Sequence, residues 1–136
     1  MSLAAIRTAL ETALATISPA LATQYENVAY TPVVGTPYQA VFLLTATPDN
    51  REIGPGYTEQ GFLQVSLFYP LDTGPAAAMA RAALIRAKFP FSATFASGGV
   101  TVIIKGTPEI SPARIEDDRY LLPLRVRWEA HLGGAA

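Results

Sequence analysis

The first apolar pattern lies near the start of the chain, where hydrophobic residues recur at steps of three and four. Residues at this spacing form one stripe on an α-helix, and polar residues cover the rest of its surface. Ser2 is suited to cap the first turn, and Pro19 ends the helix because the residue before a proline disfavours the helical conformation. The pattern predicts an amphipathic helix that lies on a core. Its stripe consists of Leu3, Ile6, Leu10, Ala13, Leu14 and Ile17.

Four later segments show the alternation or the aromatic and β-branched composition that favours strands. They are residues 38–45, 61–69, 100–105 and 119–129, and a short extended piece is expected at 28–30. The last strand contains Pro123, which cannot donate a hydrogen bond to a neighbouring strand. We therefore expect this strand to lie at an edge of the sheet or to bulge at the proline.

A second helical segment follows the turn at 70–74 and runs from Pro75 to about Lys88. Its helical wheel has two apolar faces. A helix of this kind is usually packed on both sides, so we expect one face to cover the sheet and the other to contact the first helix or another subunit. One face contains Met79, Ala80, Ala83, Leu84 and Ala87, and the other contains Ala78, Ala82, Ile85 and Phe89.

The order of these segments predicts an α+β fold. We expect a mainly antiparallel sheet of four to five strands, with two helices packed on one face. The polar stretch at 46–60 is predicted to be a long projecting loop, since such loops in compact domains are often functional. Residues 1–136 are long enough for one domain, and the small residues at 133–136 are expected to fray.

Composition then removes several classes of protein. Half of the 136 residues are hydrophobic, 15% are charged and the formal net charge is −1. This balance is unlike that of a disordered chain, and it gives no strong field toward nucleic acid or an anionic membrane. The absence of cysteine excludes disulfides and thiolate metal sites. With no signal peptide or apolar run long enough to span a bilayer, we expect synthesis in the cytoplasm without export.

Few residues could carry catalysis. His131 is the single histidine and lies beyond the last predicted strand, where an exposed side chain is the ordinary interpretation. The acidic triplet at 116–118 lacks the spacing of a calcium-binding loop. Gly54, Gly56 and Gly61 depart from the dinucleotide-binding pattern because a strand follows them, whereas phosphate binding needs a helix N-terminus. The spacing of the acidic residues does not favour a catalytic carboxylate pair. We predict no catalytic residue, no metal site and no cofactor.

Arg125 and Arg127 share one face of the last predicted strand, while Tyr120 and Trp128 fall on the other. Sheets that bind single-stranded nucleic acid place aromatic and basic residues together, so this separation disfavours direct nucleic-acid recognition. The chain has eight arginines and two lysines. Arginine is enriched and lysine depleted at protein interfaces, so the composition favours protein contacts.

Three segments, taken in order, resemble a known family. They are residues 28–32 (VAYTP) with 35–38 (GTPY), residues 61–70 (GFLQVSLFYP) with Gly74 and the helix that ends at Phe89, and residues 119–128, from RY to VRW. Together they resemble the tail-terminator, or minor tail, proteins of long-tailed bacteriophages. These motifs are structural, and the resemblance covers nearly the whole chain.

The resemblance implies an α+β subunit that forms a ring, typically a hexamer, in the virion tail. Such a ring stops polymerisation of the tail tube and offers a surface for head–tail joining. The implied partners are other copies of the chain, the tail-tube protein and a head-completion or connector protein. The family has no catalytic residue to carry over, so the chain is expected not to be an enzyme.

Contact residues are expected in three places: the loop at 46–60, the second helix and the last strand. A solvated loop is the alternative for the first, and packing on the first helix is the alternative for the second. The candidate contact residues are Arg51, Glu52, Ile53, Tyr57 and Glu59, then Arg81, Ile85 and Phe89, then Arg125 and Arg127.

Two other functions remain open from the sequence. The chain could be another ring component of a phage, such as a tail-tube or connector subunit. It could also be a small hydrolase or ligand-binding domain, which would require a deep polar pocket with titratable groups whose pKa values are shifted.

Overall fold

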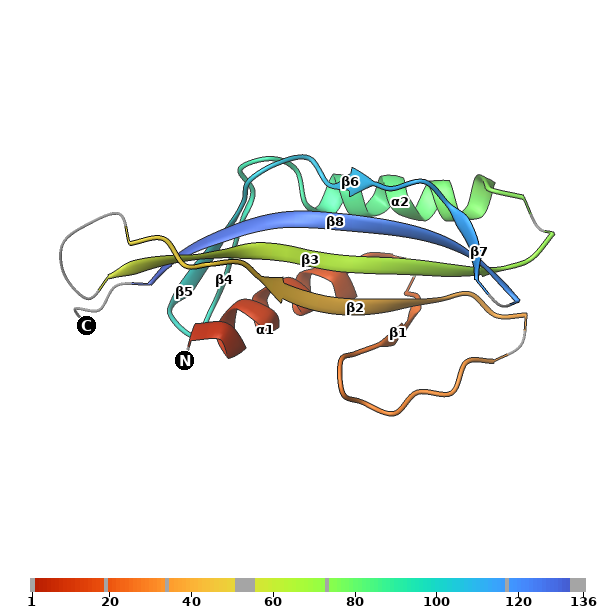
Figure 1. The fold of residues 1–136 in the computed structure, drawn as a ribbon, viewed down its shortest axis with the longest axis horizontal. Coiled ribbons are helices and arrows are strands. Elements are labelled where there is room, and N and C mark those ends of the chain that lie inside the picture. Colours follow the sequence, from red (N-terminus) through yellow and green to blue (C-terminus); the bar gives the residue numbers. More distant parts are fainter. Residues whose placement is uncertain are drawn as a thin grey trace.

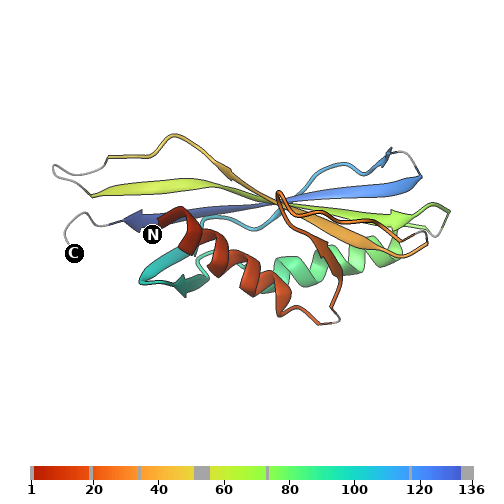
Figure 2. The same ribbon diagram turned by 90° about the horizontal axis from the view of Figure 1, so that it is seen from below.

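The computed structural model describes residues 2–18, 20–33, 35–50, 56–72, 74–116 and 118–132. Within them the fold is α+β, with one curved sheet that carries two helices on the same face (Figures 1 and 2). The helices are α1 (Ser2–Ala15) and α2 (Ala76–Lys88). The strands are β1 (Ala22–Gln24), β2 (Tyr38–Thr45), β3 (Tyr57–Pro70), β4 (Thr94–Ser97), β5 (Val100–Ile104), β6 (Glu109–Ile110), β7 (Arg114–Glu116) and β8 (Arg119–Leu132).

The two longest strands, β3 and β8, lie side by side along most of the length of the molecule (Figure 1). They pair antiparallel from Tyr57 opposite Leu132 to Pro70 opposite Arg119. The hydrogen-bonded order is β1-β2-β3-β8-β5-β4, and β6 and β7 also pair with β8. The pairing of β1 with β2 is parallel, whereas the other pairs in the described sheet are antiparallel. The predicted α+β class with a mainly antiparallel sheet is confirmed.

The helices and the sheet face that they cover form the hydrophobic core. Successive residues of a strand point to opposite faces, and the helix side receives the odd-numbered residues of β3 and the even-numbered residues of β8. Leu10 of α1, Phe89 directly after α2 and Trp128 of β8 are fully buried in this layer. The stripe predicted for the first helix is largely buried, and Leu3 is its exposed member.

The predicted number of strands is wrong, because the described sheet has eight rather than four to five. The additional strands, β1, β4, β6 and β7, contain two to four residues each, which is too short for a repeating apolar pattern. The expected extended piece at 28–30 is not a strand, and the corresponding strand is β1. These short strands exist because longer neighbours offer backbone groups with which they can pair.

Of the two positions predicted for the last strand, the sheet edge is wrong, since β8 lies between β3 and β5, whereas an irregularity of the ladder at the proline is present on the side of β6 and β7. The carbonyl oxygen of Pro123 accepts a hydrogen bond from the Ser111 N–H at 2.9 Å, on the side away from β3. The nitrogen and the carbonyl of one strand residue point to the same side, so the missing N–H of Pro123 also faces away from β3. That side of the proline lies between β6 and β7, where the ladder is interrupted. The proline is therefore tolerated inside the sheet without losing a bond to β3.

The predicted loop at 46–60 is shorter than expected. Residues 57–60 belong to β3, and residues 46–50 run beside them. The N–H of Ala46 donates to the carbonyl of Gln60 at 2.8 Å, and Asp49 and Thr58 exchange two backbone hydrogen bonds of 2.7 and 2.8 Å. The hairpin of β2 and β3 therefore continues beyond the end of β2. Residues 51–55 lie outside the described residues, as do residues 133–136.

Candidate assembly surfaces

The face of the sheet opposite the helices carries no helix in the described structure (Figure 2). The even-numbered residues of β2 and β3 and the odd-numbered residues of β8 point to it. Phe42 and Leu44 of β2 are 38% and 41% exposed. Arg125 and Arg127 of β8 are exposed on the same face. This helix-free face therefore presents apolar side chains beside two cations.

One aromatic ring, that of Phe62, lies beside the arginines of this face, although the sequence pattern did not indicate it. Arg127 is paired with Phe62 across the β3–β8 ladder, and the guanidinium carbon of Arg125 lies 5.4 Å from the centre of the Phe62 ring. Such contacts stabilise by about 0.5–1 kcal/mol at exposed sites. As predicted, Trp128 points the other way and is fully buried. Alternation identified the face of each residue within its own strand, but only the register brings Phe62 to the arginines.

A second aromatic group on this face continues toward the loop before β2. The rings of Tyr38 and Phe68 are stacked with centroids 4.7 Å apart, and Tyr30 lies 5.3 Å from Tyr38. Burial raises the pKa of the Tyr38 hydroxyl, although the positive charge of Arg119 acts in the opposite direction. The group fixes the start of β2 against β3.

Arg119 ties the loop before β2 to the first residue of β8. Its guanidinium donates to the carbonyl oxygens of Val33 at 2.7 Å and Thr36 at 2.5 Å. The same group lies 5.1 Å from the centre of the Tyr38 ring. Arg119 is 6% exposed, so its side chain is held within the fold and anchors the exposed loop to β8.

The structure changes the predicted contact surface of the second helix. Arg81, Ile85 and Phe89 are buried within the chain, so their side chains serve its own core. Met79 and Leu84 are 60% and 38% exposed on the opposite side of α2. Helices α1 and α2 are in contact, as the alternative expected, but neither α1 nor the sheet covers the side of Met79 and Leu84 among the described residues. Met79 and Leu84 replace the three buried residues as contact candidates on this helix.

The predicted contact residues near the hairpin divide between two environments. Tyr57 is half-buried and Glu59 is buried, and both lie in β3 opposite residues of β8. Their place in the ladder makes them part of a rigid strand rather than of a loop. Arg51, Glu52 and Ile53 lie outside the described residues.

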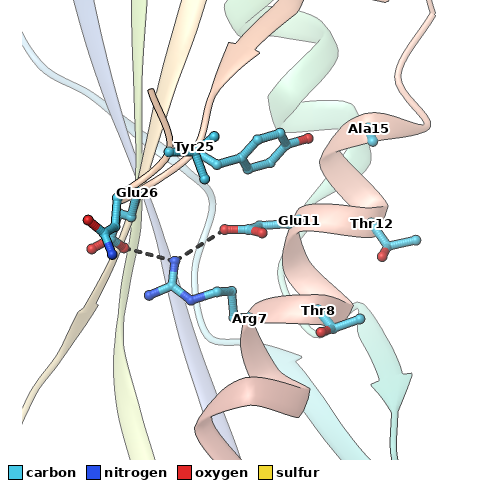
Figure 3. A pocket seen from close by; sticks show the side chains of 9 residues that line it. Arg7, Thr8, Glu11, Thr12, Ala15, Tyr25 and Glu26 are labelled. Atoms are coloured by element: carbon cyan, nitrogen blue, oxygen red, sulfur yellow. Dashed lines mark hydrogen bonds and ion pairs between the residues drawn. The ribbon is translucent and has the colours of Figure 1, made fainter. Parts of the chain in front are cut away.

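A groove of about 750 Å³ separates α1 from the residues that follow β1 (Figure 3). Arg7 lies at its centre, and its Nη1 is 2.9 Å from a carboxylate oxygen of Glu26 and 3.2 Å from one of Glu11. Burial raises the pKa of Glu26, but the hydrogen bond from the Leu43 N–H and the charge of Arg7 outweigh it and lower this pKa overall. Burial likewise lowers the pKa of Arg7, and the two carboxylates outweigh it, so this pKa is raised. The groove therefore contains one cation, Arg7, between the carboxylates of Glu26 and Glu11.

Glu26 also reaches the outer edge of the sheet. The carboxylate oxygen that contacts Arg7 accepts a hydrogen bond of 2.7 Å from the backbone N–H of Leu43 in β2. Strand β1 pairs with β2 no further than Ala40. The side chain of Glu26 thus accepts the hydrogen bond of the Leu43 N–H, beyond the point where β1 has stopped pairing with β2.

The part of the chain that the structure describes contains no helix that is long and apolar enough to cross a membrane. It also contains no group of three or more His, Asp and Glu side chains placed to hold a metal ion.

Comparisons with known proteins give a family and a shared fold. A family model described as phage tail terminator protein matches residues 5–128. One solved structure with 24% sequence identity superposes with a TM-score of 0.80 and covers 98% of both chains. At this identity the superposition shows a shared fold alone. No curated protein matches the chain at a significant level.

Proposed function

The chain belongs to the phage tail terminator protein family, and we propose that it caps the phage tail tube as a ring of identical subunits. The family indicates a structural role in the phage tail and association with other tail proteins. We expect a hexameric ring that ends tube polymerisation and then receives the head-completion or connector protein. The match over residues 5–128 carries this proposal.

The exposed surfaces of the subunit support ring formation. A closed ring with head-to-tail contacts requires two different surfaces on each copy. The helix-free face exposes Phe42 and Leu44, whereas α2 exposes Met79 and Leu84 on the other layer of the fold. Contacts on both layers allow one copy to engage two neighbours simultaneously, or one neighbour and the tube.

We propose that tube termination works by shape and charge complementarity. One face of the ring would dock on the last ring of the tube as a tube subunit does. The other face would lack the features that recruit a further tube subunit. Arg125 and Arg127 remain candidates for these contacts on the helix-free face, and Arg51, Glu52 and Ile53 remain candidates in the segment after β2.

The decisive experiment adds the purified protein to polymerising tail tubes and measures tube lengths by electron microscopy. We expect tubes of limited length with additional density at one end, and six-fold rings of the free protein at high concentration. Tubes that elongate equally with and without the protein would refute the proposal. Polymerisation of the protein into tubes by itself would favour a tail-tube subunit, and binding to the connector alone would favour a connector subunit.

A deletion tests the contribution of the segment after β2. Removing residues 51–55 and closing the gap with two glycines should abolish docking on tubes, because it removes the candidate contact residues Arg51, Glu52 and Ile53. The thermal transition should remain nearly unchanged, since the core residues are elsewhere. Normal docking by the deletion variant would remove Arg51, Glu52 and Ile53 from the contact surface.

A further inference from the structure

The second half of β2 has an outer edge without a neighbouring strand. Strand β1 ends its pairing at Ala40, while β2 continues to Thr45. Among the described residues, no other strand pairs with this outer side of β2. Unpaired backbone groups at a strand edge can pair with another chain, and proteins usually protect such edges.

The hydrogen-bond pattern shows which groups point outward. The N–H of Ala46 bonds to β3, and the N–H of Leu43 bonds to Glu26 on the opposite side. Backbone direction alternates along a strand, so Thr45 points outward with Leu43. The edge at 43–45 therefore presents the N–H of Thr45 and the carbonyls of Leu43 and Thr45. The N–H of Leu43 is already bonded to Glu26.

Glu26 is held at this edge from the helical layer. Arg7 of α1 contacts the same carboxylate oxygen that accepts the Leu43 N–H, and Glu11 holds Arg7 from the other side (Figure 3). The side chain of Glu26 is 33% exposed and that of Arg7 is 35% exposed. The contact is thus accessible from solvent and can be displaced by an incoming strand without disturbing the core.

We propose that the outer edge of β2 at residues 43–45 is a strand-docking surface for a second copy of this chain, and that Glu26 keeps it closed in the free subunit. A second copy is the fitting occupant because residues 41–46 (VFLLTA) carry no charge that would select an oppositely charged partner. Phe42 and Leu44 are exposed directly beside the edge, so an added strand would also cover apolar surface. The opposite end of the sheet is the uncharged strand β4, which gives each copy two unlike sheet ends.

This inference rests on the proposed ring, and it adds a barrier that would delay the association of free subunits. A charged hydrogen bond to Leu43 must break before the edge can pair. Contact with the tube or with a neighbour would provide the compensating interactions. The carboxylate then remains bound to Arg7 and is not left without a partner.

The test compares self-association by sedimentation velocity over a concentration series. Glu26→Ala should lower the midpoint concentration of association by roughly tenfold, the change expected from removing one charged hydrogen bond that competes with pairing. Glu11→Ala is the matched control, because it removes the other carboxylate on Arg7 but leaves the bond to Leu43. Should Glu26→Ala fail to fold, Glu26→Gln keeps the length of the side chain but replaces the charged acceptor of the Leu43 N–H by a neutral and weaker one, so it should shift association in the same direction.

A second substitution identifies the edge itself. Thr45→Pro removes an outward N–H that no strand uses, so it costs no bond to β3 and blocks a neighbour. Glu26→Ala/Thr45→Pro should therefore lose the enhanced association. The proposal is overturned if Glu26→Ala associates as the wild type does, or if adding Thr45→Pro leaves the enhancement intact. Tube capping by the wild type is measured separately. If the wild type caps tubes and Glu26→Ala does not change self-association, only the closed edge is refuted. If the wild type does not cap tubes, the proposed ring is refuted.

Discussion

Replacing Arg119 by methionine tests whether one side chain holds the loop before β2. The guanidinium donates to the carbonyls of Val33 and Thr36 and lies over the ring of Tyr38. Methionine retains much of the side-chain length and its apolar contact with the ring, but it removes both donors. The change therefore isolates the hydrogen bonds and the charge from the packing.

The expected loss follows from the surroundings of these bonds. A hydrogen bond from a charged group stabilises a protein by about 1.5–3 kcal/mol, so two of them set an upper limit of about 6 kcal/mol. Val33 and Thr36 are exposed residues, and water can replace the missing donors at their carbonyls. We therefore expect the free energy of unfolding to fall by about 2 kcal/mol. For a chain of this length the melting temperature should fall by roughly 6–10 °C.

Thermal unfolding followed by circular dichroism measures this loss, and amide hydrogen exchange locates it. Exchange should accelerate at residues 35–38 and remain slow in β3. Arg114→Met is the control, because Arg114 is exposed and its ion pair with Glu116 is 3.6 Å long. We expect the control to change stability by less than about 0.5 kcal/mol. The reasoning fails if Arg119→Met melts within about 2 °C of the wild type and exchange in the loop is unchanged.

Three further predictions concern other parts of the fold. Because the pKa of Glu26 is lowered in the folded chain, its ion pair with Arg7 should stabilise the fold at pH values above the ordinary carboxyl pKa, and this stabilisation should disappear as the pH falls through the lowered value. An NMR titration of the Glu26 carboxyl, together with unfolding measured over the same pH range, checks this, and an ordinary pKa for Glu26 would contradict it. Gly61→Ala should destabilise by about 2 kcal/mol or more, since its Cβ would overlap the carbonyl oxygen of Leu44; an unchanged denaturant midpoint would show that β2 can move away. Phe89→Ala should cost about 3–5 kcal/mol because the ring is fully buried, and a loss below about 1 kcal/mol in chemical denaturation would mean that the core closes over the cavity.

The sequence by itself determined the elements that repeat an apolar pattern over many residues. The stripe from Ile6 to Leu14 specified α1, and the alternation of Leu63, Val65 and Leu67 specified the buried face of β3. Burial of apolar side chains is the main source of stabilisation, and it acts on any segment whose period matches a helix or a strand. The class of the fold and the faces of the long strands therefore follow from local patterns.

The candidate assembly surfaces were only partly accessible in this way. The sequence identified two apolar faces on the second helix, but it assigned contact roles to Arg81, Ile85 and Phe89, which are buried within the chain. Which of two apolar faces meets the sheet depends on the position of the whole helix. That position is set by packing against several strands, and the sequence of the helix alone does not contain it.

Tertiary structure alone decided the contacts between segments that are distant in the chain. The register of β3 against β8 places Phe62 beside Arg125, and the interruption between β6 and β7 accommodates Pro123 within the sheet. The hydrogen bond from the Leu43 N–H to Glu26 has no periodic signal, because a side chain bonds there to a backbone group seventeen residues away. Such bonds depend on where chain segments meet in space, and a local pattern of apolar and polar residues does not encode that meeting.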